Sequence, residues 1–122
     1  MADITVENLQ KRFASFTAVK NSNFKIYDGE FFVLLGPSGC GKTTTLRMIA
    51  GIEIPSSGKI ILDQDDVTFK RARERDIAFV FQLFALYPHM NVRQNMAFPL
   101  ENEKFSKSEV KRRVEDIAKM LK

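Results

Sequence analysis

Residues 36–44 read GPSGCGKTT and match the pattern G-x-x-x-x-G-K-[ST] at every defined position. This pattern is typical of loops whose backbone N–H groups surround a phosphate, because glycines supply the backbone conformations that such a loop needs. Lys42 is expected to reach the β- and γ-phosphates, and Thr43 is placed to put its hydroxyl on Mg²⁺. A helix that begins here adds a partial positive charge at its N-terminus. The stretch therefore predicts a site for a nucleoside triphosphate.

The segments on either side of this loop favour a strand before it and a helix after it. Phe31–Leu35 is an unbroken apolar run, which predicts a strand buried on both faces. Leu46, Met48 and Ile49 continue as a helix, and Gly51 is suited to end it. The order strand, loop, helix is the context in which a phosphate-binding loop is credible.

Further strands are predicted before this region. Ile4, Val6 and Leu9 alternate loosely with polar residues, as in a strand with one buried face. Phe24 and Ile26 also alternate with polar residues, and a turn follows them at residues 28–29. We expect these to be short antiparallel strands that lead into a parallel core.

More strands are predicted after the loop helix. Residues 55–58 have the composition of a turn, and residues 59–63 that of a strand. Ile77–Phe81 is a second unbroken apolar run, and it ends at Gln82. A polar amide at the C-terminal end of a buried strand stands where ligands bind in α/β sheets, so Gln82 is a candidate site residue.

Asp63 offers two interpretations. An apolar run that ends in an aspartate resembles a second nucleotide motif, whose carboxylate helps to hold Mg²⁺. The residues that follow, Gln64, Asp65 and Asp66, instead favour ordinary turn chemistry, and no glutamate follows as a candidate base. We therefore predict a turn at Asp63.

Composition limits the class of protein. The 122 residues carry a net charge of +4 and are 44% hydrophobic, which suits one soluble domain or a piece of a larger one. No apolar run approaches the roughly 20 residues that span a bilayer, and the first residues lack signal-peptide features, so a cytosolic location is expected. The single cysteine, Cys40, excludes an internal disulfide and a cysteine-ligated zinc site. The basic run Lys70–Arg75 is interpreted as a solvated face rather than a nucleic-acid site.

Leu83–Met90 is too apolar for an ordinary loop. It is either a buried connection or an exposed patch that docks a partner. His89 within it is the only histidine, and it is interpreted as a packing or hydrogen-bonding residue rather than a catalyst.

The last third of the chain predicts two helices. Asn91 with Gln94 can form a capping box for a short helix that ends near Pro99. Ser106 with Glu109 repeats the capping signal. An apolar stripe at helical spacing then predicts a packing face, made of Val110, Val114, Ile117 and Leu121.

Several of these segments together resemble the N-terminal half of an ATP-binding-cassette (ABC) ATPase. They are the loop at 36–44, LRMIAG at 46–51, the turn at 57–58, VFQ at 80–82 and ALYPHM at 85–90. The resemblance runs from about Ile4 to Lys122, and residues 81–98 are most similar to the ATPase subunits of carbohydrate importers of the maltose type.

The resemblance implies an α/β fold, a P-loop NTPase of the ABC type, with an antiparallel β subdomain and the start of a helical subdomain, truncated at residue 122. Residues 1–122 would be the N-terminal part of one nucleotide-binding domain. Its parts would be the β subdomain (1–30 and 58–68), the P-loop core (31–57 and 76–82), and the Q-loop with the start of the helical subdomain (83–122).

The resemblance also implies roles for single residues. Phe13 matches the aromatic residue that stacks on adenine, with Phe16 as its rival. Lys42 and Gln82 would be catalytic, and Thr43 and Gln82 would bind the metal. With ATP and Mg²⁺ as cofactors, the nucleotide-binding set would be Phe13, Val19, Gly36, Pro37, Ser38, Gly39, Cys40, Gly41, Lys42, Thr43 and Thr44.

Two protein partners are implied as well. Leu83–Met90 matches the surface that receives a coupling helix of the transmembrane permease subunits, and a second ABC ATPase subunit would complete a head-to-tail dimer. No nucleic acid is implied. The protein would be cytoplasmic, peripheral on the inner face of the plasma membrane, and would couple ATP binding and hydrolysis to import of a sugar or related compound.

The motifs of the family's second half are missing from these residues: there is no L-S-G-G-Q signature, no Walker B run ending in Asp-Glu and no later switch histidine. The chain alone is therefore expected to bind Mg-nucleotide without turning it over. Residues 70–72 also replace a stretch that often carries prolines in maltose-type importers. Two alternatives stay open: a non-hydrolysing nucleotide-binding or interaction fragment, and a cassette ATPase that acts on DNA, against which the Tyr87-Pro88-His89 patch argues.

Overall fold

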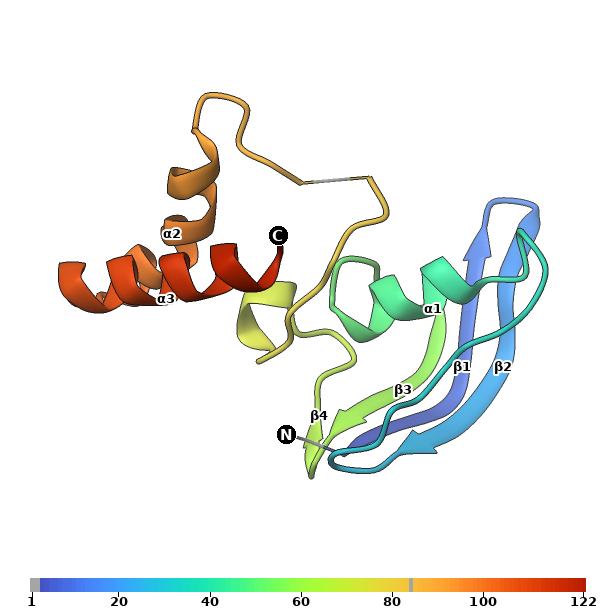
Figure 1. Ribbon diagram of the computed structural model, residues 1–122. Coiled ribbons are helices and arrows are strands. Elements are labelled where there is room, and N and C mark those ends of the chain that lie inside the picture. Colours follow the sequence, from blue (N-terminus) through green and yellow to red (C-terminus); the bar gives the residue numbers. More distant parts are fainter. Residues whose placement is uncertain (1–2, 84) are drawn as a thin grey trace. The chain divides into compact units, whose positions relative to one another are not determined.

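The computed structural model describes residues 3–83 and 85–122, and these form two compact units (Figure 1). The first unit, Met1–Phe79, contains an antiparallel sheet and a helix, and the second, Val80–Lys122, contains two helices. Each unit is described by itself. None of the helices in the described part of the chain is long and apolar enough to cross a membrane.

The sheet of the first unit has four strands in the order β2-β1-β3-β4. Each neighbouring pair among them is antiparallel, and Val6 of β1 lies opposite Phe24 of β2 on one side and Ile60 of β3 on the other. The antiparallel strands predicted from the sequence are confirmed, although the first two are longer than expected. The strands are β1 (Ile4–Phe13), β2 (Phe16–Ile26), β3 (Ser57–Leu62) and β4 (Asp65–Asp66).

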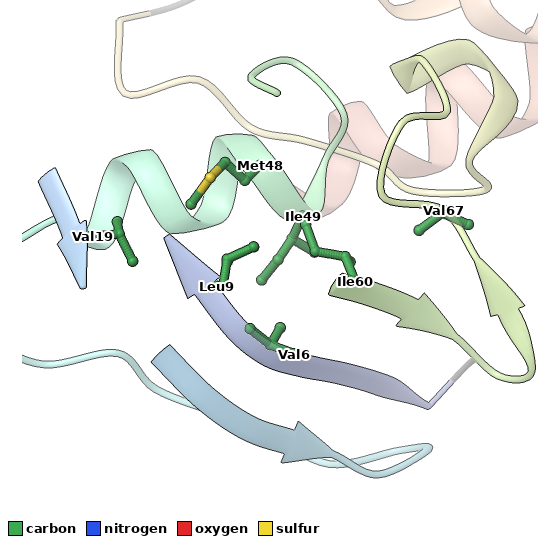
Figure 2. Packing of buried hydrophobic residues seen from close by; sticks show 7 residues of the cluster. All are labelled: Val6, Leu9, Val19, Met48, Ile49, Ile60 and Val67. Atoms are coloured by element: carbon green, nitrogen blue, oxygen red, sulfur yellow. The ribbon is translucent and has the colours of Figure 1, made fainter. Parts of the chain in front are cut away.

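Helix α1, Lys42–Ile49, packs its apolar side on this sheet (Figure 2). Met48 of the helix and Leu9 and Ile60 of the strands are each 0% exposed. Burying a side chain of this size contributes roughly 1.5–3 kcal/mol. The whole cluster is Val6, Leu9, Val19, Met48, Ile49, Ile60 and Val67. This core fixes the helix, and therefore the loop that precedes it, against β2.

The helix ends where the sequence predicted. Gly51 has φ 72° and its N–H donates to the carbonyl of Met48 at 3.1 Å. A Cβ atom at this position would lie 2.7 Å from Nε of Arg75 and 2.8 Å from the backbone nitrogen of Ala72. Both the left-handed backbone and this close approach require glycine.

The two apolar strands predicted at Phe31–Leu35 and Ile77–Phe81 are wrong for this chain, because neither stretch has strand structure in the described residues. Phe31 is 92% exposed, Leu35 87% and Val80 93%. A parallel strand gains its hydrogen bonds only from a neighbouring strand that is distant in sequence. In the described chain the only paired strands are the four of the antiparallel sheet, β1, β2, β3 and β4. The expected parallel core is therefore not formed.

The second unit begins with helix α2, Val92–Asn102. The predicted capping box is confirmed: the N–H of Gln94 donates to Oδ1 of Asn91 at 2.9 Å, and the N–H of Asn91 donates to Oε1 of Gln94 at 2.8 Å. The predicted end near Pro99 is wrong, because Pro99 lies inside the helix. Proline removes one N–H donor, and here the later N–H groups continue the helix, as in the bond from Glu103 to the carbonyl of Pro99 at 3.1 Å.

Helix α3, Lys107–Met120, begins at the predicted cap, where Oγ of Ser106 accepts from the N–H of Glu109 at 3.3 Å. The carboxylate of Glu109 binds Arg112 and Arg113, and these hydrogen bonds lower its pKa from 4.5 to about 2. The predicted apolar stripe is buried only in its first half. Val110 and Val114 pack on Ala97 of α2, whereas the second half, Ile117 and Leu121, is 44% and 75% exposed.

Candidate nucleotide-binding site

The loop at residues 36–41 runs directly into the first turn of α1 and rests on β2. Gly41 is the N-cap of the helix, with φ 94°, and a Cβ atom on it would lie 2.4 Å from the carbonyl oxygen of Ala18. Only glycine allows the loop to approach the strand this closely. Since β2 is fixed in the core through Val19, the position of the loop is fixed as well.

Lys42 is the first residue of α1, and its side chain folds back over the loop. Its ammonium donates to the carbonyl oxygens of Gly36 at 2.6 Å and Pro37 at 2.7 Å, and Sγ of Cys40 lies 3.5 Å away. The charge is thereby held at the N-terminus of the helix. There the first N–H groups have no intrahelical acceptor and the helix dipole favours an anion.

The three threonines after Lys42 occupy successive positions of the first turns. Thr43 is exposed, Thr44 is half-buried and Thr45 is buried. Thr43 is therefore an exposed residue at the same helix end as the Lys42 ammonium, and Thr44 is partly exposed there. The remaining predicted loop residues, Gly36, Pro37, Ser38, Gly39 and Cys40, are all exposed.

A cleft of about 570 Å³ lies between the loop and the sheet. One wall is β2 from Phe16 to Phe24, another is Leu34 and Leu35, and the loop and the start of α1 close the rest. Lys20 and Lys42 supply its charge, and the residues that line it include no carboxylate. A cleft with two cations and a helix N-terminus is suited to a polyanion.

The aromatic residues at the end of the β1–β2 hairpin differ in their relation to this cleft. Phe13 and Phe16 lie opposite each other in the hairpin, and they are 44% and 58% exposed. The structure brings Phe16 and Val19 into the wall of the cleft, whereas Phe13 is not among its lining residues. The ammonium of Lys11 lies 4.8 Å from the ring centroid of Phe13.

Gln82 is an exposed residue at a bend in the second unit, so the loop and Gln82 belong to separately described parts of the chain. Asp63 fits the turn interpretation. Its φ is 53°, its Oδ1 accepts from the N–H of Asp3 at 2.8 Å, and its own N–H donates to the carbonyl of Asp3 at 2.8 Å. Among the described residues, no group of three or more His, Cys, Asp or Glu side chains could hold a metal ion.

Arg75 is a structural residue that the sequence interpretation missed. It was placed on a solvated face, but it is 5% exposed, and burial lowers the pKa of its guanidinium. Its Nη1 donates to the carbonyls of Met48 at 2.7 Å and Ile49 at 2.6 Å, so it caps the C-terminal end of α1. Its Nη2 also donates to the carbonyls of Thr68 and Lys70. This cation at the helix C-terminus is favourable to the dipole of the loop helix.

In the second unit, Leu83 and residues 85–89 are exposed, Met90 is half-buried, and Phe84 lies outside the described residues. Leu83 is 84% exposed, Leu86 68% and Tyr87 43%, which contradicts the interpretation as a buried connection. A groove of about 760 Å³ lies between this segment and α2, and most of the residues that line it are apolar. The segment and groove together form an exposed apolar surface, here named the loop surface.

Comparison with known proteins gives a consistent result. A family model described as ABC transporter matches residues 19–122. The chain is 52% identical over 94% of its length to the spermidine/putrescine import ATP-binding protein PotA of Nitrosomonas eutropha. It is 48% identical over 99% of its length to the trehalose/maltose import ATP-binding protein MalK of Thermococcus litoralis. It spans about a third of each relative, 32% and 34% respectively.

The fold comparison agrees with the sequence comparison. The dimeric structure of MJ0796, a bacterial ABC transporter cassette, matches with a TM-score of 0.86 at 31% sequence identity. The match covers 96% of this chain and 56% of that cassette.

Proposed function

The chain belongs to the ABC transporter family, and from this premise we propose that it is the ATP-binding part of a subunit that drives import of a solute. The observation that carries the proposal is the position of the Lys42 ammonium, held 2.6 Å from the carbonyl of Gly36 at the N-terminus of α1. Phosphate oxygens in the loop would compete with the carbonyls for this ammonium and would also accept from the N–H groups of the first turn.

Mg²⁺ would neutralise part of the phosphate charge when the nucleotide binds. Thr43 fits this role because it is an exposed residue at the start of α1. Gln82 is proposed as a contact to the ion and to the attacking water, as the family resemblance implies. The hairpin end would receive the base, at Phe13 as the family resemblance implies or at Phe16, which lines the cleft beside Val19.

We expect this chain alone to bind nucleotide without turning it over. Hydrolysis needs a base or water-orienting group and stabilisation of the transferring phosphoryl group. Cations and hydroxyls of the cleft can stabilise charge, but no carboxylate lines it. The base and the completing surface would come from elsewhere in a longer subunit and from a second subunit placed head to tail.

The transported solute is proposed as a sugar or related compound, on the basis of the likeness to the trehalose/maltose import protein. The similar likeness to a spermidine/putrescine import protein keeps a polyamine as the competing class. The subunit would lie in the cytoplasm against the inner face of the membrane. It would meet the permease subunits there through the loop surface.

Docking of a permease helix on the loop surface is supported by exposure and by shape. The side chains of Leu83 and Leu86 are mostly exposed. The groove beside them is lined by further apolar residues of α2, including Met96 and Phe98. An amphipathic helix could insert apolar side chains into such a groove.

The nucleotide proposal is tested by alkylation of Cys40, the single cysteine of the chain. Its thiol is exposed and lies 3.5 Å from Nζ of Lys42, so a nucleotide bound to the loop would cover it. We expect saturating Mg-ATP to slow labelling by N-ethylmaleimide about tenfold or more, whereas adenosine, which lacks phosphates, should not. Equal labelling rates with and without Mg-ATP would refute the loop as the binding site.

The docking proposal is tested by Tyr87→Asp, which places a charge where the ring packs on Phe98 at a centroid distance of 4.7 Å. We expect it to abolish co-purification with co-expressed, detergent-solubilised permease subunits, with ATP affinity unchanged. Tyr27→Asp is the matched control, because Tyr27 is also exposed but lies in the first unit. Normal assembly of Tyr87→Asp would reject the loop surface as the docking site.

A further inference from the structure

The backbone of the turn at residues 87–90 of the loop surface is bound by the side chain of Asn95 on α2. Oδ1 of Asn95 accepts from the N–H of Tyr87 at 2.8 Å. Its Nδ2 donates to the carbonyls of Tyr87 at 3.2 Å, Met90 at 3.0 Å and Asn91 at 3.0 Å. A single carboxamide thus binds both ends of the turn at residues 87–90.

These four contacts, in which three carbonyls share the two N–H groups of Nδ2, occupy most of what a carboxamide can offer. Asn has two N–H donors and one carbonyl acceptor with two lone pairs, so both donors and one acceptor position of Asn95 are used within the chain. The side chain is half-buried beside the groove. Its hydrogen bonds therefore hold the segment in place and leave little capacity to bind an incoming partner.

The next turn of the same helix holds the side chain of Tyr87. Asn95 and Phe98 are three residues apart and lie on one face of α2. Asn95 binds the backbone of Tyr87, and Phe98 contacts its ring at a centroid distance of 4.7 Å. Position and ring orientation of Tyr87 are therefore set by two neighbouring residues of the helix.

A backbone bond within this turn gives it less support. The N–H of Met90 donates to the carbonyl of Tyr87 at 3.0 Å, which closes a turn but does not attach it to α2. The capping box of Asn91 and Gln94 fixes the start of the helix and not the segment before it. Loss of the Asn95 carboxamide would leave the turn joined to the helix mainly by the Tyr87 ring.

We propose that Asn95 is a positioning residue for partner docking: its carboxamide holds residues 87–90 in the conformation that a permease helix recognises. This inference rests on the proposed docking function of the loop surface. It assigns to Asn95 no contact with nucleotide and no contact with the partner.

The test uses the full chain with Asn95→Ala and the matched control Asn102→Ala, which removes the same carboxamide from another residue that lines the groove on the same helix. Amide hydrogen exchange of Tyr87 is measured by NMR, with the amide of Val110 in α3 as the internal reference. We expect exchange of Tyr87 to accelerate about tenfold in Asn95→Ala only, with Val110 unchanged. Co-purification with the solubilised membrane subunits should fall about tenfold in the same variant, with ATP affinity unchanged.

Asn95→Asp guards against a simple loss of packing, because it keeps the shape of the side chain and the acceptor for Tyr87 while it removes both N–H donors. It should dock as poorly as Asn95→Ala. Unchanged Tyr87 exchange in Asn95→Ala, or faster exchange with normal docking, would overturn the inference. A wild-type chain that fails to bind the membrane subunits would instead overturn the docking function, and the exchange data would still report whether Asn95 holds the loop.

Discussion

Two apolar regions of the first unit differ in how far their side chains are buried. Strands β1 and β3 bury Leu9 and Ile60 completely, at 0% exposure, whereas the apolar segment Phe31–Leu35 leaves Phe31 at 92% and Leu35 at 87%. The segment still shows the period of an extended strand. Phe32 stacks on Phe24 of β2 at 5.3 Å and Leu34 is half-buried, while Phe31 and Leu35 are largely exposed, although Leu35 also lines the cleft. Hydrophobicity alone therefore does not decide which region is packed.

The difference lies in whether a pairing strand is found: β3 pairs with β1, where Ile60 lies opposite Val6 although the two are far apart in the sequence, whereas Phe31–Leu35 is in no ladder of the described residues. β1 and β2 are joined by a two-residue hairpin turn, so their hydrogen bonds form between residues that are close in the sequence. A parallel strand needs partners that the local sequence cannot supply. The same contrast suggests that local signals are sufficient for the hairpin and insufficient for the apolar segment.

The largest effect is expected from matched leucine truncations, which test whether the two regions differ in burial in solution. Leu9→Ala removes a fully buried side chain and should lower the free energy of unfolding by about 2–5 kcal/mol. Leu35→Ala removes the same atoms from an 87% exposed position and should change it by less than about 0.5 kcal/mol. The measurement is urea unfolding followed by circular dichroism. Equal losses in the two variants would show that Phe31–Leu35 is packed in solution.

A smaller effect, on nucleotide affinity, is expected from the two aromatic residues at the end of the hairpin. Phe13→Ala should weaken Mg-ATP binding about fivefold, because loss of ring stacking costs on the order of 1 kcal/mol. Phe13→Tyr should keep the affinity. Phe16→Ala is the matched control from the residue directly opposite in the hairpin. If only Phe16→Ala lost affinity in a fluorescence titration, the base would bind at the wall of the cleft instead.

Helix boundaries were predictable to the extent that their signals are local. Gly51 ends α1, and the cap residues Asn91 and Ser106 begin α2 and α3, because each signal acts through bonds to residues within one turn. Pro99 misled the prediction, since a missing N–H is tolerated where the following turns supply their own bonds. The two apolar strands failed because a strand also needs a paired neighbour, which an apolar pattern by itself does not encode.

The residues of the candidate site were likewise predictable only where their sequence signal is local. The loop from Gly36 to Thr44 was found because a fixed spacing encodes its chemistry, and the structure gathers its glycines and Lys42 at the start of α1. The burial of Arg75 could not be predicted from a basic run. Its acceptors, the carbonyls of Met48 and Ile49, lie 27 and 26 residues away. Nor does the sequence pattern distinguish Phe13 from Phe16 as a wall of the cleft.

The central claim is that Lys42 and the loop around it bind nucleotide phosphates. The direct measurement is isothermal titration of Mg-ATP into the 122-residue chain and its Lys42→Ala variant. Lys20→Ala is the matched control because Lys20 also lines the cleft. Loss of a charge-assisted bond predicts at least about tenfold weaker binding for Lys42→Ala and less than about threefold for Lys20→Ala.

Phosphate release measured in the same samples should show no multiple turnover, since no carboxylate lines the cleft. Lysine-dependent turnover would mean that another group completes a catalytic site in this chain. Equal Mg-ATP affinity in the wild-type chain and Lys42→Ala would contradict the central claim.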